Sequence, residues 1–236
     1  MARLHDQWTV LRHGPLREID EGLLTVVGDI PMPFGKFPRR MTVVGLADGR
    51  TAIFSAIPLV EPEMERIEAL GEPAFLIVPS GIHRLDIRPY KARYPKARVV
   101  APPGAREQVS EAVAVDLVTD RLDDPDAHFL TVNGNSDAAM LVRRPGGASL
   151  IVNDIIGHVT RTAGFGPWLI SLLTGFGAKQ PVVPRPVKVS NPAELAALFE
   201  EWAEIPGLRR IIPSHGEIID DQPAAELRRL AQALRS

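Results

Sequence analysis

Three potential metal ligands follow three short apolar segments of the chain. His83 ends the segment IVPSGIH, His215 lies in IIPSHG, and Asp154 follows LIVN. Loops at the carboxyl ends of buried strands commonly carry the sites of α/β proteins, so these three side chains can converge on one point. Two neutral imidazoles and one carboxylate suit Zn²⁺, Fe²⁺ or Mn²⁺ with open coordination positions. The alternative is that they are polar loop residues held by local hydrogen bonds.

Two neighbouring residues could complete such a centre. His158, four residues beyond Asp154, is a candidate fourth ligand. Asp86 is a candidate general base, although a solvated aspartate at the start of a helix is the commoner interpretation. No Gly-x-Ser-x-Gly elbow is present, so a serine nucleophile is not indicated. If the chain is an enzyme, we expect Asp154 and His215 to be its catalytic residues.

The composition is that of an ordinary globular protein and excludes several classes of function. Of 236 residues, 45% are hydrophobic and 24% are charged, and the net charge is −2. The absence of cysteine excludes disulfides, thiolate nucleophiles and cysteine-ligated metals. Nucleic acid is not an expected partner, because the basic residues form pairs rather than a run, namely Arg39-Arg40, Arg143-Arg144 and Arg209-Arg210.

The beginning of the chain carries no signal for export. The segment MARLHDQWTV has no apolar core, and no window reaches the roughly 20 apolar residues of a membrane span. We therefore expect a cytoplasmic protein without a membrane span, with a small-molecule substrate or ligand as its partner.

The elements that must position the three ligands are short strands alternating with helices. Asp48-Gly49 predicts a hairpin turn, and Asn191-Pro192 predicts the start of a helix that runs to about Trp202. The order of elements fits one domain over residues 1–236, with an N-terminal approach over 1–20. Its class is α/β, either a four-layer αββα sandwich or a single sheet. Strands are predicted at 22–27, 42–46, 51–54, 74–78, 97–101, 115–118, 128–132, 139–142, 149–152 and 210–212, and helices at 60–70, 87–93, 105–113, 191–202 and 223–234.

From Leu23 to about His215, the chain resembles the metallo-β-lactamase fold superfamily, and within it a divergent branch. The opening strands with the Asp48-Gly49 hairpin, the loop VPSGIH and the turn PSHG carry this resemblance. The family has a His-x-His-x-Asp-His loop after a strand, a bridging aspartate, and a last histidine in a Pro-Gly-His-Gly-like turn. On this register His83, Asp154 and His215 match the family's ligands.

The departures from the family pattern imply at most one metal site. Val78 and Ser80 stand where the family has its first two histidines, and Ile82 replaces its aspartate. Asn135, in the segment NGNS, replaces the histidine of a Gly-His-Ser-like turn. A two-metal hydrolase centre is therefore not expected. Ser80 and Asn135 become candidate substrate-binding residues instead.

An apolar and Pro-rich insert over 160–190 follows the Asp154 loop. Its apolar part, FGPWLISLLTGF, has three interpretations: an ordinary core helix, a wall of the substrate site that includes Trp168, or a contact in a homodimer or on a membrane surface. It is too short to span a bilayer.

Two functions are consistent with the sequence. The first is a divergent hydrolase with one divalent metal, acting on a small ester, thioester or lactone-like substrate. The second is a non-catalytic descendant of the fold that has lost its metals and binds a small molecule or a partner in the same cleft. The surviving ligands favour the first, and the four replaced positions favour the second.

Overall fold

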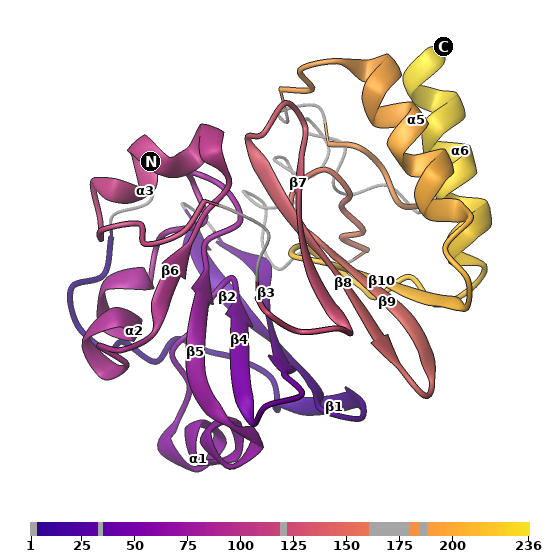
Figure 1. Cartoon of the computed structure of the whole chain (residues 1–236). Coiled ribbons are helices and arrows are strands. Elements are labelled where there is room, and N and C mark those ends of the chain that lie inside the picture. The colour runs from indigo at the N-terminus through magenta and orange to yellow at the C-terminus, as the bar shows by residue number, and fades with distance from the viewer. Residues whose placement is uncertain (1–3, 33–34, 119–121, 161–179, 185–187) are drawn as a thin grey trace.

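The computed structural model is a stack of four layers (Figure 1), and it describes residues 4–32, 35–118, 122–160, 180–184 and 188–236. Two β-sheets face one another, and helices cover the outer face of each sheet. The αββα sandwich expected from the sequence is therefore confirmed, and the single-sheet alternative is wrong.

The first sheet has the strand order β1-β2-β3-β4-β5-β6. The pairs β1-β2, β2-β3 and β3-β4 are antiparallel, whereas the pairs β4-β5 and β5-β6 are parallel. The Asp48-Gly49 turn joins β3 to β4 as predicted, with Gly49 in the left-handed region at φ 78°. The strands are β1 (Arg17–Asp20), β2 (Leu23–Met32), β3 (Gly35–Gly45), β4 (Arg50–Phe54), β5 (Glu72–Ile77) and β6 (Arg98–Val100).

The second sheet has the order β10-β9-β8-β7. Strands β7, β8 and β9 form an antiparallel meander, and β10 joins β9 in parallel. This parallel pair brings the ends of two distant segments to the same edge, which matters for the site described below. The strands are β7 (Ala127–Val132), β8 (Asp137–Arg144), β9 (Gly147–Val152) and β10 (Leu208–Pro213).

Side chains that alternate between the two faces of a strand belong to separate apolar clusters. On β3, Val43 faces the outer helices and the next residue, Val44, faces the other sheet, since successive strand side chains point to opposite faces. The inner cluster joins Phe54 and Phe75 to Phe129 of the second sheet. The helices are α1 (Glu61–Leu70), α2 (Ile87–Arg93), the 3₁₀ turn η1 (Pro103–Ala105), α3 (Arg106–Ser110), α5 (Pro192–Ala203) and α6 (Pro223–Arg235).

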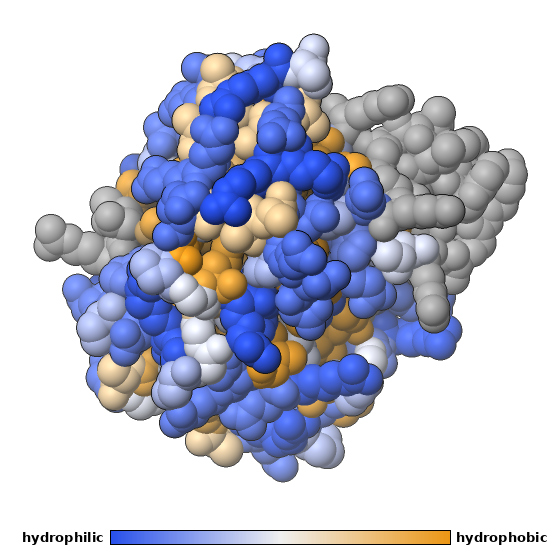
Figure 2. Space-filling view, turned by 90° about the vertical axis from the view of Figure 1, so that its right-hand side faces the viewer, coloured by the Kyte–Doolittle hydropathy of each residue, from blue (hydrophilic) through white to orange (hydrophobic). Residues whose placement is uncertain are grey.

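The two C-terminal helices bury one face and expose the other. The side chain of Asn191 accepts hydrogen bonds from the backbone N–H groups of Ala193 and Glu194, so the predicted N-cap of α5 is confirmed. Helix α6 buries Leu227 and Leu230, at the spacing of one helical face. Seen from their side, the surface is mostly hydrophilic, with only small separated apolar patches (Figure 2).

Some expected elements differ from the structure. The helix predicted over 105–113 is the 3₁₀ turn η1 followed by the short α3, and the strand predicted at 115–118 is a single bridge at Leu117. Strand β1 was not predicted, because its segment REID is short and mostly charged. The insert over 160–190 lies largely outside the described residues. Among the residues that are described, no helix is long and apolar enough to cross a membrane.

Candidate metal centre

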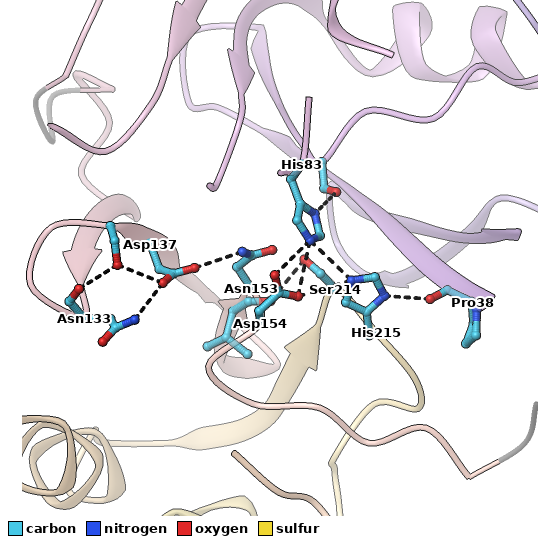
Figure 3. Close-up of polar contacts among 11 residues, drawn as sticks. Pro38, His83, Asn133, Asp137, Asn153, Asp154, Ser214 and His215 are labelled. Atoms are coloured by element: carbon cyan, nitrogen blue, oxygen red, sulfur yellow. Dashed lines mark hydrogen bonds and ion pairs between the residues drawn. The ribbon is translucent and has the colours of Figure 1, made fainter. Parts of the chain in front are cut away.

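The three candidate ligands come from three segments that the fold brings to one edge. Asp154 lies two residues beyond β9, and His215 lies two residues beyond β10. Because Val152 pairs with Pro213 in parallel register, both chains leave the sheet side by side. His83 reaches the same point from the other sheet, from the loop between β5 and α2 (Figure 3).

The turn that carries His215 depends on a glycine. Gly216 has φ 101°, and a Cβ atom there would lie 1.9 Å from the carbonyl oxygen of His158. This close approach lets the segment after β10 pair with the segment after β9, through a hydrogen bond from the backbone N–H of His158 to the carbonyl of His215. The backbone of His158 thus holds the His215 turn against the Asp154 loop.

The ligand atoms of the three side chains face one another at short range. Nε2 of His83 lies 3.3 Å, and Nε2 of His215 lies 3.2 Å, from the same carboxylate oxygen, Oδ1 of Asp154. The two Nε2 atoms are 3.3 Å apart. Ligands at the usual zinc distances in a tetrahedral arrangement would be separated by about 3.3–3.4 Å. The triangle of donor atoms therefore has the dimensions of one face of a tetrahedral metal site.

The second nitrogen of each imidazole is engaged outside this triangle. Nδ1 of His215 lies 2.7 Å from the carbonyl oxygen of Pro38, which can only accept, so Nδ1 carries the proton and neutral His215 presents a lone pair at Nε2. Nδ1 of His83 lies 3.1 Å from the hydroxyl of Ser55. If Nδ1 donates to this hydroxyl, His83 also presents a lone pair to the centre.

Ser55 occupies an unusual backbone position directly after β4. Its φ is 58°, which is uncommon for a residue with a side chain, and its N–H donates to the carbonyl of Ile77 at the end of β5. The strained position directs the hydroxyl of Ser55 toward His83. Neither Ser55 nor the carbonyl of Pro38 was predicted as part of the site, because nothing in the local sequence marks a lone serine or a main-chain carbonyl.

Electrostatics keep Asp154 ionised. Burial by itself raises the pKa of this carboxyl, but the charges that His83 and His215 carry when protonated, and the hydrogen bonds that they then donate, more than offset that effect and hold its pKa far below the ordinary range. Three electron-rich atoms at this spacing repel one another unless a cation, either a metal ion or protons on the imidazoles, lies among them. The donor set, its dimensions and its outer hydrogen bonds therefore fit one divalent transition metal.

A second buried carboxylate lies beside the centre (Figure 3). Asp137, at the start of β8, accepts hydrogen bonds from the side-chain amides of Asn133 and Asn153 at 2.9 and 3.1 Å. It also accepts one from the hydroxyl of Ser136 at 3.2 Å. Through Asn153 this network is linked along the chain to Asp154.

The remaining predicted site residues lie at different distances from the triangle. Among the described residues, the group of metal-binding type contains His83, Asp154 and His215 but not His158. Ser80 is buried, and its hydroxyl has no hydrogen-bond partner within the described ranges. Asn135 is exposed in the turn between β7 and β8, and its carbonyl accepts a hydrogen bond from the N–H of Gly104. Trp168 lies outside the described residues.

Two of the four positions at which the resemblance would require ligands carry apolar side chains, which cannot bind a metal. Val78 is buried in the core, and Ile82 is 68% exposed. Asp86, considered above as a base or as a solvated helix start, is buried instead and paired with Arg39 and His5. These pairs leave it no free face toward the centre, so the structure does not support its use as a base.

Comparisons with known proteins bear on the fold. Neither a scan against protein-family models nor a search of curated proteins finds a match. Solved metallo-β-lactamases do match. VMB-1 has a TM-score of 0.65 at 11% identity over 94% of this chain and 98% of its own. FIM-1 from Pseudomonas aeruginosa, in its mono-zinc form, has 0.64 at 10% identity over 96% and 98%. The enzyme from Erythrobacter litoralis has 0.64 at 12% identity over 95% and 100%.

These likenesses span nearly the whole of each chain, and at such low identity they establish the fold alone. The chain therefore has the fold of the metallo-β-lactamases, and the resemblance read from its sequence is confirmed at that level.

Proposed function

We propose that the chain is a hydrolase with one divalent metal ion held by His83, Asp154 and His215. The observation that carries this proposal is the triangle of donor atoms, with edges of 3.2–3.3 Å and two imidazoles oriented by outer hydrogen bonds. The substrate class is a small ester, thioester or lactone. Zinc, iron and manganese all suit two imidazoles and a carboxylate.

Each residue has a distinct role in this proposal. When bound, a divalent ion at such a site polarises a carbonyl group and lowers the pKa of water. His83 and His215 bind the ion as neutral imidazoles, and Asp154 binds it as a carboxylate. Ser80, Asn135 and Trp168 remain proposed substrate-binding residues, and His158 a proposed fourth ligand.

Elemental analysis of untagged protein purified without chelator tests the metal site. We expect about one equivalent of zinc, iron or manganese in the wild type, and none in His83→Ala or His215→Ala. A screen of esters, thioesters and lactones follows with the loaded protein. Hydrolysis by a metal-free preparation would overturn the mechanism.

A non-catalytic binding protein is the second candidate. Val78, Ile82 and Asn135 stand where the resemblance would require ligands, and no side chain in the described part of the chain replaces the lost aspartate at Ile82. In that case His83, Asp154 and His215 form a charged hydrogen-bonded cluster with a shared proton. Absence of metal after incubation with each ion in turn would favour this candidate. A cytoplasmic location and a homodimer contact through the insert remain predictions.

A further inference from the structure

A buried ion pair lies behind the metal centre, on the helix-covered side of the first sheet. Nη1 of Arg39 lies 2.5 Å from Oδ2 of Asp86, and the side chains are 6% and 0% exposed. The other oxygen of Asp86 lies 2.7 Å from Nδ1 of His5. Asp86 precedes α2 and lies three residues after His83, so this pair ties the His83 loop to β3.

The same stretch of β3 also holds the His215 turn. The carbonyl of Pro38 accepts the hydrogen bond from Nδ1 of His215. The N–H of Arg40 donates to the carbonyl of Ser214 at 2.8 Å, and Nη2 of Arg40 donates to the carbonyl of Gly216 at 2.6 Å. Adjacent side chains of a strand point to opposite faces of the sheet. Arg39 therefore contacts the segment that carries His83, and Arg40 contacts the segment that carries His215.

The connection from Asp86 to His83 is short and internally bonded. The N–H of His83 donates to the carbonyl of Ser80, and the N–H of Ile87 donates to the carbonyl of Arg84. Because backbone hydrogen bonds close both turns of this loop, a displacement of Asp86 also displaces His83. The distance between the imidazoles of His83 and His215 is therefore set by a strand that contributes no ligand itself.

The Arg39–Asp86 pair is poorly suited to a role in stability alone. Nε and Nη2 of Arg39 are buried without hydrogen-bond partners in the described part of the chain. Burying charged groups is costly, and a buried ion pair with unsatisfied donors is commonly less stabilising than apolar side chains of the same volume. The fixed direction of a charged hydrogen bond, by contrast, is what a metal ligand loop needs.

We propose that Arg39 and Asp86 are positioning residues that set the spacing of His83 and His215 for metal binding. This inference rests on the proposed metal site. It assigns a role to Arg39, which the sequence alone marks only as one of two adjacent basic residues.

The chain offers a matched control for the test. Arg210 on β10 pairs with Asp20 on β1, with an Nη1–Oδ2 distance of 2.7 Å, and each side chain is 11% exposed. This ion pair is partly buried and also joins two segments distant in sequence, but its partners do not adjoin a ligand. Arg39→Met and Arg210→Met therefore remove the same kind of interaction at two places.

Zinc affinity is measured by competition with a chromophoric chelator, and the visible spectrum is recorded with Co²⁺. We expect Arg39→Met to bind zinc at least tenfold more weakly and to shift the cobalt spectrum, as for other residues that orient a ligand. Arg210→Met should lower the melting temperature but keep zinc affinity within twofold. Arg39→Lys, which keeps the charge, should restore part of the affinity. Equal losses in the two methionine variants, or no loss in Arg39→Met, would overturn the proposal.

A second readout separates this inference from the proposed function. Without added metal, amide hydrogen exchange over residues 80–87 should be faster in Arg39→Met and unchanged in Arg210→Met. If the wild type binds neither zinc nor cobalt, the proposed metal function fails, and this exchange result decides whether the pair positions the loop. Asp86→Asn replaces Arg39→Met if the latter does not fold.

Discussion

Two buried carboxylates lie beside one another in this protein, and their surroundings differ in one respect. Asp137 is surrounded by N–H and O–H donors from Asn133, Asn153 and Ser136. Asp154, only 17 positions later, has no amide or hydroxyl donor among its described partners. Its partners are the Nε2 atoms of His83 and His215.

The comparison shows that burial alone does not make a metal site. Both residues are less than 10% exposed. The negative charge of Asp137 is stabilised by protons that belong to neutral groups, so that cluster is complete as it stands. Around Asp154, the Pro38 carbonyl holds the proton of His215 on the far side of the ring, which leaves acceptors facing an acceptor. A divalent metal ion, or a proton on the Nε2 atom of either imidazole, completes this cluster.

The sharpest way to test the comparison is to remove one imidazole. His215→Ala should reduce zinc affinity by a factor of 100 or more, because one of three ligands is lost, and should abolish hydrolysis. The measurement is zinc titration in competition with a chelator. His158→Ala, from the same paired segments, tests the proposed fourth ligand, and a zinc affinity within a few-fold of the wild type would exclude His158 from the site. A comparable loss in His158→Ala would instead make His158 a ligand.

Removing the charge of Asp154 should have the next largest effect. Asp154→Asn keeps the shape of the side chain, but an amide is a weak metal ligand, so zinc affinity should fall by about two orders of magnitude. The variant should stay folded by circular dichroism. Unchanged affinity would show that the carboxylate takes no part in the site.

The same substitution at Asp137 should have the opposite profile. In Asp137→Asn one of the donors now faces an NH₂ group, so the free energy of unfolding should fall by about 1–3 kcal/mol. Zinc affinity should stay within a few-fold, because the ligand triangle is intact. Urea denaturation and zinc titration of the same preparation provide both numbers. A loss of affinity as large as in Asp154→Asn would erase the distinction between the two carboxylates.

In the absence of metal, the free energy of unfolding should depend on acidic pH differently in the wild type and in Asp154→Asn. The pKa of Asp154 is lowered from its ordinary value of 3.8, so the unfolded chain binds more protons than the folded chain below that pH. This contribution to stability is present above about pH 4 and is lost as the pH falls further, by at most about 1.4 kcal/mol per unit. Urea denaturation between pH 5 and pH 3 should show a shallower decline for Asp154→Asn. Parallel declines would contradict the lowered pKa.

The smallest effect is expected from the outer hydrogen bond of His83. Ser55→Ala removes the partner of Nδ1 and leaves all three ligands, so zinc affinity should fall about fivefold, the value of one ordinary hydrogen bond. Because Ser55 has a positive φ, Ser55→Gly is the useful companion, since it also relieves backbone strain. Both variants should bind zinc alike if the hydroxyl is what matters.

Much of the fold could be predicted from local pattern. The strand that ends near Val78, helix α2 and the Asn191 cap all follow from apolar periodicity and capping chemistry, which act over a few residues. Predictions failed where tertiary contacts override local preference. The charged segment REID forms a strand because β2 offers it a partner, and Asp86 is buried because Arg39 and His5 surround it.

The sequence by itself determined which side chains could bind a metal. It supplies one histidine or aspartate at the end of each of three buried strands. Only the tertiary structure decided that His83, Asp154 and His215 meet at 3.2–3.3 Å, and that a main-chain carbonyl and a strained serine orient the imidazoles. The physical reason is that ligand type is a property of single residues, whereas spacing and tautomer depend on contacts between residues from 28 to 177 positions apart in the sequence.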